Sequence, residues 1–443
     1  MTQQFQAHKF KRFALVAIAG IAVAGVVGCA SVDASDDSIQ GFSPVEQDSD
    51  STVTVWVDAA RLASAEAYQA ANPDTNLDIV TYDTADLQTK ISLADKSGSG
   101  WPDVVFSQSL TDVGWATSGK TPFAAPLNDG IFPDDKIEGF ATGALDPCTV
   151  GGTLYCVRND IAQNVFWYNE TLMGEFGYDL PTTWEDFAAL GEKLSTEHPG
   201  YVLGSVGDQF APNVYFWGAG CPAATLDGVK FSSDLTAPEC TEMAALLDGM
   251  VANGSLVIDG LFSAEYATTY GAKTLGFVGP SWAGKIVWGD MLGTAAGNVA
   301  AAEPFSWEGK DAVTGNVGGG VWYISSHSAN LEGASALVEW LTTSEENQAS
   351  AGTYPAYTAA AMAWLENPAN TEFFASDVGP AFKTAADQVW SGWSAISRAD
   401  PNVPWGSTVV PGLVAGKTIS EQLPEWETEI LNLAPTVGYT VEK

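Results

Sequence analysis

Basic residues are scarce in this chain of 443 residues, which has 18 lysines and arginines against 54 acidic residues, a formal charge of −36. Such a surface repels a phosphate backbone and has no basic patch to bind one, which argues against nucleic-acid binding. It also disfavours an anionic small ligand, although a single local arginine or lysine can override the global field. The charge therefore favours a neutral ligand.

The low hydrophobicity that is typical of disordered chains is also absent. Hydrophobic residues make up 46% of the chain and aromatic residues 11%, so most of it can bury a large core. The length predicts two or three domains, or one bilobed unit.

Complete catalytic and metal-binding motifs are missing. The chain has no H-E-x-x-H, G-x-S-x-G or EF-hand pattern, and 412–418 has one residue too few between its glycines for a P-loop. A zinc site would need closer cysteine spacing together with histidine, and only His198 and His327 follow residue 28. Two carboxylates suffice for glycoside hydrolysis, but 54 acids do not single out a pair. We expect no cofactor and no metal.

The first 28 residues have the pattern of a secretory signal. Lys9, Lys11 and Arg12 precede an apolar stretch over residues 13–28. A retained membrane helix over residues 13–30 is the alternative, because this length is close to the minimum for a span.

The end of this segment, Val26-Val27-Gly28-Cys29, resembles the bacterial lipobox. The resemblance implies removal of residues 1–28 as a signal peptide, and addition of diacylglycerol to the sulfur of Cys29. Two or more acyl chains, palmitate among them, anchor a protein stably. We therefore expect a lipid-anchored protein on the extracellular face of the cell membrane, in a Gram-positive cell.

Residues 30–50 are rich in serine and aspartate and contain no basic residue. Such a segment repels itself and cannot bury a core, so 29–50 is predicted to be a lipidated cysteine followed by a disordered acidic tether. An acidic interaction tail is the alternative interpretation. Removing the signal takes away three basic residues and no acid, which leaves a formal charge of −39.

Four cysteines remain after Cys29, namely Cys148, Cys156, Cys221 and Cys240. Four cysteines allow three connectivities. The favoured pairing is Cys148–Cys156 with Cys221–Cys240, which closes two short loops, and disulfides are consistent with an extracellular location.

Strands and helices alternate at the start of the folded part. Strands are expected at 52–57, 77–82 and 103–107, with helices at 61–72 and 86–96 between them. This order predicts a parallel sheet in an α/β domain. Further strands are expected at 162–168, 203–206, 274–278 and 318–325, and further helices at 171–176, 181–194, 238–253, 331–342, 344–350, 377–395, 408–413 and 420–433.

Tryptophan is abundant, with 16 residues. A sugar has apolar C–H faces that suit an aromatic ring, and hydroxyls that need polar partners. Any single tryptophan more often belongs to the core, but the set as a whole favours carbohydrate. Gly318–Gly320 either approaches a ligand or lets a strand pass between layers. Eight tryptophans lie beside glycine, proline or polar residues: Trp56, Trp115, Trp217, Trp282, Trp288, Trp322, Trp393 and Trp405.

Several stretches, taken in order, resemble one protein family. They are TVTVWV (52–57), WPDVV (101–105), NVFWYN (164–169), LPTTWEDF (180–187), GPSW (279–282), GGGVWYIS (318–325) and the helix 334–341 before SEE (344–346). Over essentially all of Ser51–Lys443 the chain resembles the extracellular solute-binding lipoproteins of ABC sugar importers, the maltose-binding-protein-like group.

The resemblance implies an α/β fold of two lobes, the type II periplasmic-binding-protein-like fold, with a ligand cleft between lobes joined by hinge strands. Lobe one is expected at about 51–160 plus 290–345, and lobe two at 161–289 plus 346–443. The chain is expected to cross between lobes near 160–163, near Asp290 and near 344–353.

The resemblance also suggests ligand-binding residues. Trp282 matches a cleft aromatic, although Ser281 is an insertion relative to the commoner G-P-W, and Trp322 follows the glycine run. For each polar candidate, helix capping or a surface ion pair is an equally good interpretation. The full candidate set is Asp58, Arg61, Asp103, Trp115, Asp160, Trp217, Trp282, Trp322, Tyr354 and Trp405.

The expected function is the substrate-binding component of an ABC transporter, a monomer and not an enzyme. It would capture a neutral di- to hexasaccharide by hinge closure and deliver it to the membrane permease. A peptide or polyol ligand stays open. The alternatives are a secreted, lipid-anchored glycoside hydrolase and a structural or adhesive surface protein.

Overall fold

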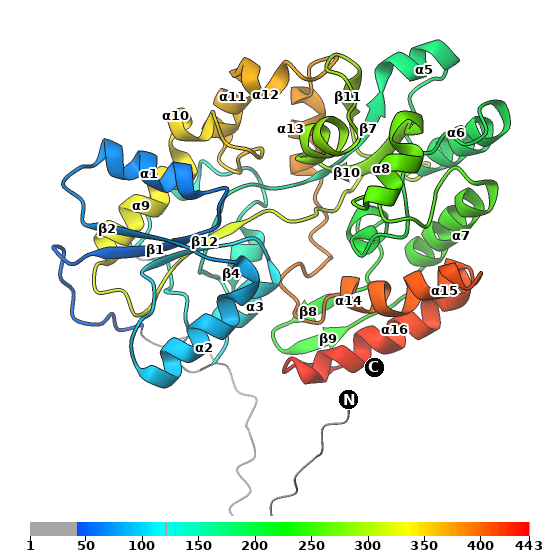
Figure 1. Ribbon diagram of the computed structural model, residues 1–443. Coiled ribbons are helices and arrows are strands. Elements are labelled where there is room, and N and C mark those ends of the chain that lie inside the picture. The colour runs from blue at the N-terminus through cyan, green and yellow to red at the C-terminus, as the bar shows by residue number, and fades with distance from the viewer. Residues whose placement is uncertain (1–41, 120–121, 129, 443) are drawn as a thin grey trace, which may run out of the picture. The chain divides into compact units, whose positions relative to one another are not determined.

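The computed structural model describes residues 42–119, 122–128 and 130–442 (Figure 1). The expected signal peptide, the lipidation site Cys29 and residues 30–41 of the expected tether lie outside the described residues. In the part that is described, no helix has both the length and the apolar character needed to cross a membrane.

The first sheet has five strands, in the order β2-β1-β3-β12-β6. β1 pairs in parallel with β2 and β3, while β12 is antiparallel to β3 and β6. The expected parallel α/β arrangement is confirmed for β1, β2 and β3, whereas β12 and β6 make the sheet as a whole mixed. The β-branched and apolar residues of its central strands are buried. The strands are β1 Val53–Val57, β2 Leu77–Thr81, β3 Val104–Ser107, β6 Val157–Arg158 and β12 Val321–Ile324.

Helices cover both faces of this sheet. α1 and α9 pack together, and Figure 1 shows α2 and α3 on the other side. The helices are α1 Leu62–Ala71, α2 Leu87–Ser97, α3 Thr111–Ala116 and α9 Leu331–Thr343. Short elements complete this part: η1 Thr84–Asp86, α4 Asp134–Ile137, η2 Asp146–Cys148 and the hairpin of β4 Thr149–Val150 and β5 Thr153–Leu154.

The second sheet is antiparallel, in the order β10-β7-β11. Its strands are β7 Asn164–Asn169, β10 Gly276–Pro280 and β11 Val299–Ala302. The helices and helical turns around it are α5 Glu170–Phe176, α6 Trp184–Glu197, η3 Pro212–Phe216, α7 Pro238–Asn253, α8 Ala264–Tyr270, η4 Gly271–Lys273, η5 Gly284–Met291, α10 Glu345–Gln348, α11 Thr358–Glu366, α12 Pro368–Thr371 and α13 Gly379–Asp387.

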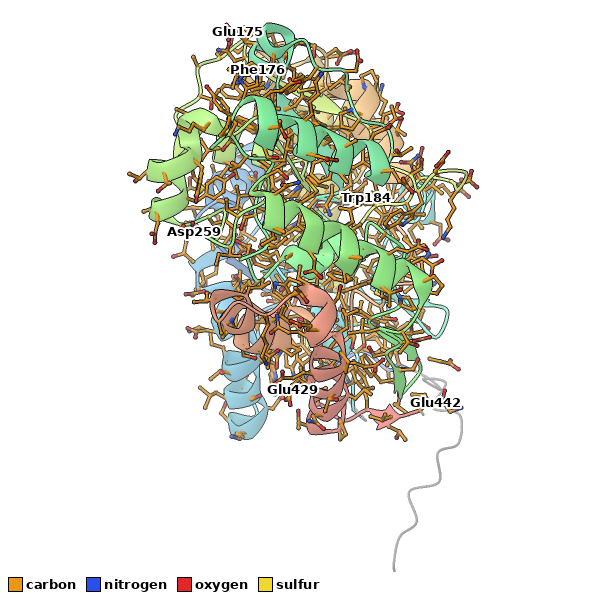
Figure 2. The ribbon with its side chains drawn as sticks, turned by 90° about the vertical axis from the view of Figure 1, so that its right-hand side faces the viewer. Glu175, Phe176, Trp184, Asp259, Glu429 and Glu442 are labelled. Atoms are coloured by element: carbon orange, nitrogen blue, oxygen red, sulfur yellow. A yellow bond between two sulfur atoms is a disulfide. The ribbon has the colours of Figure 1, made fainter. Side chains whose placement is uncertain are left out.

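The C-terminal segment packs onto α7. Figure 2 shows α6, α7 and the long C-terminal helix α16 in a row, and the contacts between them agree. The remaining elements are β8 Thr225–Asp227, β9 Lys230–Ser232, α14 Asn402–Pro404, η6 Trp405–Val409, α15 Val410–Val414, α16 Ile419–Thr436 and β13 Thr440–Val441, with β13-β9-β8 forming a small third sheet.

Within the described residues, three segments link the two halves of the structure. The first two connect strands of the large sheets, and the third leads from α9 to the helices around the second sheet. The first lies between β6 and β7, and the third includes the bridge between Asp160 and Pro355. The second crossing was expected near Asp290, but β11 pairs with β7 through residues 299–302. The chain therefore leaves the second sheet only after Ala302. The sequence did not predict β11, because its residues, Val-Ala-Ala-Ala, have small side chains.

The expected disulfide pairing is confirmed, with Cys148 bonded to Cys156 and Cys221 to Cys240. The second bond ties the segment after η3 to the first turn of α7.

The end of the expected tether is not free of the folded body. The amide of Gln47 donates to the carbonyl of Ser328, and the backbone N–H of Asp48 donates to Ala329 O. Asn330 in turn donates to the carbonyl oxygens of residues 49 and 51. Residues 47–50 are therefore ordered, because their main chain is paired with the loop before α9.

Candidate ligand-binding cleft

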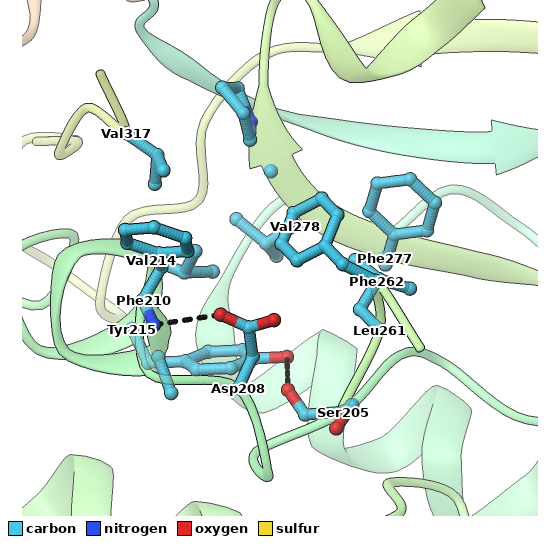
Figure 3. Close-up of a pocket in the computed structure, with 13 residues that line it drawn as sticks. Ser205, Asp208, Phe210, Val214, Tyr215, Leu261, Phe262, Phe277, Val278 and Val317 are labelled. Atoms are coloured by element: carbon cyan, nitrogen blue, oxygen red, sulfur yellow. Dashed lines mark hydrogen bonds between the residues drawn. The ribbon is translucent and has the colours of Figure 1, made fainter. Parts of the chain in front are cut away.

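A cavity of about 790 Å³ lies between the two large sheets. This volume falls in the range of small-molecule sites. A smaller recess adjoins it (Figure 3). Five stretches of chain supply most of the cleft lining: 84–88, 107–112, 209–217, 316–320 and 393–402.

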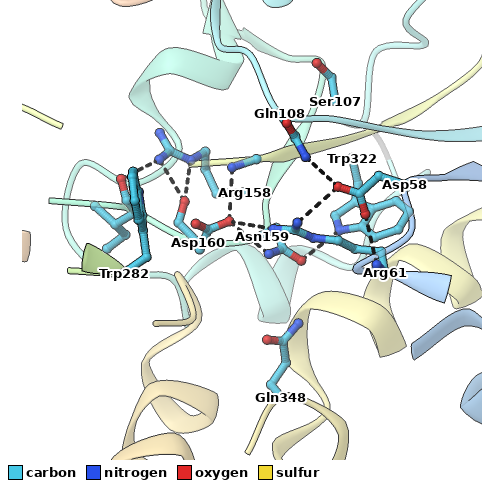
Figure 4. A network of polar contacts seen from close by, with 12 residues as sticks. Asp58, Arg61, Ser107, Gln108, Arg158, Asn159, Asp160, Trp282, Trp322 and Gln348 are labelled. Atoms are coloured by element: carbon cyan, nitrogen blue, oxygen red, sulfur yellow. Dashed lines mark hydrogen bonds and ion pairs between the residues drawn. The ribbon is translucent and has the colours of Figure 1, made fainter. Parts of the chain in front are cut away.

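Arg61 lies in the cleft between two carboxylates (Figure 4). Its guanidinium is 3.2 Å from Asp58 Oδ2 and 3.7 Å from Asp160 Oδ1, and it stacks 4.2 Å above the Phe106 ring. Gln108 Nε2 donates to the same Asp58 oxygen at 2.7 Å. The positive charge of Arg61 is therefore balanced within the protein.

Asp160 is fixed from three further directions. Its Oδ1 accepts hydrogen bonds from Asn159 Nδ2 and from the backbone N–H of Gly320. Its backbone carbonyl accepts two bonds from the Arg158 guanidinium, at 3.0 and 2.8 Å. A carboxylate with this many donors is held rigidly, so it offers the cleft a preorganised acceptor.

Arg158 is fully buried and binds main-chain carbonyls of 160 and 161. Burial lowers its pKa to about 10, an effect that the nearby Asp160 opposes, so the guanidinium stays charged at neutral pH. A Cβ at Gly319, whose φ is +87°, would lie 2.1 Å from the Arg158 guanidinium. A Cβ at Gly320 would lie 2.2 Å from the Phe106 ring.

The glycine run has the packing role that its sequence suggested, and close approach to a ligand stays a prediction. Gly318, Gly319 and Gly320 all line the cleft, and the last two also let the chain pass Arg158 and Phe106 closely.

Asp112 supplies a second fixed carboxylate. It accepts from Ser107 Oγ at 2.6 Å and from Gln88 Nε2 at 2.9 Å. All three residues line the cleft. The amide of Gln88 and the Asp112 carboxylate together form a polar edge that hydroxyl groups can join.

Aromatic rings form part of the opposite wall. Trp217 and Trp393 stack with centroids 5.4 Å apart and planes 6° from parallel, and Trp217 Nε1 donates to Trp390 O. Trp282 Nε1 donates to Val317 O at 2.9 Å. Because main-chain carbonyls bind these two indole N–H groups, both rings are held in place. Trp217 is buried, so the partly exposed Trp282 is the ring that offers the cleft its apolar surface.

Polar atoms without a hydrogen-bond partner lie at the same wall of the cleft. The side-chain oxygens of Asn213 and Asn402 are buried and have no hydrogen-bond partner among the described residues. Burial raises the pKa of Asp400, against hydrogen bonds from Asn402 that lower it. Buried oxygens without partners cost free energy unless a ligand or water donates to them.

Four of the ten candidates line the cleft, namely Arg61, Asp160, Trp217 and Trp282. Asp58 reaches it through its bonds to Arg61 and Gln108.

Asp103 and Trp115 do not line the cleft. Asp103 accepts from Thr54 N and Ser328 Oγ at the start of β3, whereas the cleft lies at the other end of that strand. Trp115 stacks near Phe123 and lines a separate hollow of about 480 Å³. Both residues were expected to contact the ligand, and both lie elsewhere.

Three aromatic candidates belong to the core. Trp322 donates to Asn159 Oδ1 inside the first sheet, and Tyr354 packs on Phe382. Trp405 is fully buried against Trp426. Their expected place in the cleft is wrong, because apolar neighbours enclose each ring.

The sequence interpretation missed much of the cleft. Trp393 was not among the ten candidates. Its glycine and polar neighbours in the sequence were the one signal that could have identified it as a cleft residue. The others are short polar side chains brought together only by the fold: Gln88, Gln108, Asp112, Asn213, Asn316, Asp400 and Asn402.

Two α/β lobes with a ligand-sized cleft between them define the type II binding-protein fold. The solved galacto-N-biose-/lacto-N-biose I-binding protein of Bifidobacterium longum has this fold, with a TM-score of 0.73 at 17% identity over 90% of this chain and 100% of that one. The model for bacterial extracellular solute-binding proteins matches residues 63–392, and the chain belongs to this family.

Curated relatives match over shorter stretches. An uncharacterised ABC transporter extracellular-binding protein of Pyrococcus horikoshii is 30% identical over 132 residues, 29% of each chain. The arabinooligosaccharide-binding protein of Halalkalibacterium halodurans is 28% identical over 144 residues, 30% of each chain. The chain thus matches about a third of the length of these relatives.

Proposed function

We propose that this protein is the substrate-binding component of an ABC importer and that it captures a neutral oligosaccharide in the cleft. The carrying observation is the pairing of a fixed, partly exposed tryptophan ring, Trp282, with a set of carboxylate and amide groups that line the same cleft. Rings suit the C–H faces of a sugar, and acceptors suit its hydroxyls.

The balanced charge of the cleft supports a neutral ligand. Arg61 is paired with Asp58 and Asp160, and Asp112 and Asp400 add further acidity. An anionic sugar would meet no unpaired cation among the described lining residues.

The relatives support the same proposal, since one is named as binding arabinooligosaccharides and one solved neighbour holds lacto-N-biose. In the proposed mechanism, the first lobe comprises about 51–160 and 318–345, and the second about 161–317 and 346–443. Sugar that contacts both lobes would favour the closed form, which a membrane permease would then receive. We further propose a monomer anchored through lipid on Cys29 at the outer face of the membrane, with no turnover of the ligand.

A thermal-shift screen of residues 30–443 against neutral oligosaccharides tests the function. A ligand bound by the folded state alone raises the melting temperature by mass action. We expect one class of glycan to do so and to be recovered intact by mass spectrometry. The absence of any shift would contradict sugar binding, and recovery of cleaved glycan would indicate a hydrolase.

A further inference from the structure

A small, largely apolar recess opens beside the cleft (Figure 3). Its free volume is about 20 Å³, enough for one water molecule or one methyl group. Three of its lining residues are polar, namely Ser205, Asp208 and Tyr215, and the rest are apolar. The lining residues that enclose most of this space are Phe210, Val214, Leu261, Phe262, Val278 and Val317.

The recess and the cleft share a wall. Phe210 and Val317 line both spaces. Trp282 of the cleft lies 5.8 Å from Phe262, and Phe262 lies 6.2 Å from Phe210, measured between ring centroids. A sugar seated on Trp282 can therefore direct a substituent into the recess.

One carboxylate, that of Asp208, lies among the apolar residues that line the recess. Asp208 Oδ1 accepts from the backbone N–H of Phe210 at 2.8 Å, and none of the ion pairs among the described residues involves Asp208. Burial raises its pKa. The nearby hydroxyls are already committed, because Ser205 donates to Asp259 O and Tyr215 donates to Ser205 O. The second oxygen of Asp208 is thus the acceptor available to a ligand.

We propose that the recess receives the N-acetyl group of a sugar unit, with the methyl among Phe210, Phe262 and Val317 and the amide N–H donated to Asp208 Oδ2. This inference rests on the proposed function and narrows it to oligosaccharides that contain an N-acetylhexosamine. A plain hydroxyl would leave the apolar space unfilled. A free ammonium would have to be desolvated against the same apolar walls.

Three matched sugars test the proposal on residues 30–443. N-acetylglucosamine, glucosamine and glucose, and their galacto equivalents, differ only at the C2 substituent, so no linkage need be known. We expect the acetamido sugar of one series to bind about 10–30-fold more tightly than its hydroxyl partner by calorimetry.

Two variants assign this preference to the recess. Val214→Ile adds one methylene to the empty space, and Asp208→Asn replaces the free acceptor with a donor but can keep the bond from Phe210 N. Each should reduce the preference to about twofold or less while the hydroxyl sugar binds as before. Val229→Ile, at a position 57% exposed, is the matched control and should change nothing.

The outcomes are distinguishable. Binding of neutral sugars without preference for the acetamido member, or preference for the amine, overturns this inference and leaves the proposed function in place. A preference that survives in both variants also overturns it. If no saccharide binds, either here or in the oligosaccharide screen, the proposed function fails and this inference fails with it.

Discussion

Arg61 shows how a charged side chain could serve the neutral ligand that we propose for the cleft. The two carboxylates on either side, Asp58 and Asp160, hold its guanidinium in one orientation. Its N–H groups can then bind hydroxyl oxygens by charge-assisted hydrogen bonds without giving the cleft a net positive charge. Orientation, rather than long-range attraction, is what this arginine contributes.

Trp282 is the aromatic residue whose loss should weaken binding most directly. In Trp282→Ala, we expect the dissociation constant of the sugar found in the screen to rise about 10–100-fold, because the apolar platform disappears. Isothermal titration calorimetry measures it. Trp405→Phe, in the core away from the cleft, should lower the melting temperature and leave affinity unchanged. Equal affinity of Trp282→Ala and the unaltered protein would contradict the assignment.

Asp400 should make stability depend on pH. Burial raises its pKa in the folded state, so folding favours the protonated form. Its stabilising contribution is therefore present at low pH and decreases as pH rises above the unfolded pKa of about 4. Asp400→Asn, which keeps an acceptor for Asn402 N, should be more stable than the unaltered protein at pH 7.

The advantage of Asp400→Asn should shrink as pH falls toward 4, as urea unfolding at several pH values would show. A difference that is independent of pH between 4 and 7 would mean that Asp400 does not titrate differently in the folded protein.

At the scale of single residues, the sequence predicted that there is a ligand cleft better than it predicted which residues line the cleft. Trp282 and Trp322 stand in similar glycine-rich surroundings, yet only the former lines the cleft. β12 is flanked by β3 and β6 and the Trp322 ring packs on Phe106, so it is covered. Which of the two rings faces solvent depends on segments that are distant in the sequence, so the neighbouring residues do not predict it.

Among the elements, the helix expected at 181–194 exists as α6 but begins and ends three residues later, at Trp184 and Glu197, with a side-chain cap at its start. The Thr183 hydroxyl oxygen accepts a hydrogen bond from the Asp186 N–H, and the Asp186 carboxylate accepts one from the Thr183 N–H, which completes a capping box at the start of α6. These hydrogen bonds lower the pKa of Asp186.

Removing this cap gives a prediction for stability. Thr183→Ala should lower the free energy of unfolding by about 1 kcal/mol, because the backbone N–H of Asp186 in the first turn of α6 loses its acceptor. Chemical denaturation measures it. Thr196→Ala, at an exposed position in the last turn of the same helix, should change it by less than about 0.5 kcal/mol. A similar loss in both variants would refute a specific role for the cap.

Elements were misread where the main chain pairs with a distant segment. The strand expected at 203–206 forms one isolated bridge, between Ser205 and Val257, next to a bridge between Val202 and Thr274. The helix expected over 377–395 ends at Asp387, because the following backbone pairs with Thr314 instead. Because the helix ends at Asp387, Trp393 lies outside it and lines the cleft. Such pairings depend on where distant segments lie in the fold, and the local spacing of apolar residues does not predict this.

For the molecule as a whole, the excess of acids should make stability sensitive to salt. Six side-chain ion pairs form within the described residues, few against 54 acids. Screening should therefore relieve more repulsion than attraction. We expect the melting temperature to rise by several degrees between about 0.02 and 0.5 M NaCl.

Differential scanning fluorimetry in NaCl and in KCl checks this, and the two salts should act alike if screening is the cause. A melting temperature that falls with salt, or rises with one cation only, would point to specific ion binding instead.

The buried guanidinium of Arg158 has a consequence for how the lobes can move. Its partners are carbonyl oxygens of the first crossing segment, and Gly319 of the second crossing packs against it. Every residue type has a carbonyl, so no change to a partner side chain can replace or release this link. Further bonds link the same two crossings, from Gly320 N–H to Asp160 Oδ1 and from Val317 N–H to Ala162 O. In the hinge motion that we propose, the two crossings would therefore move together.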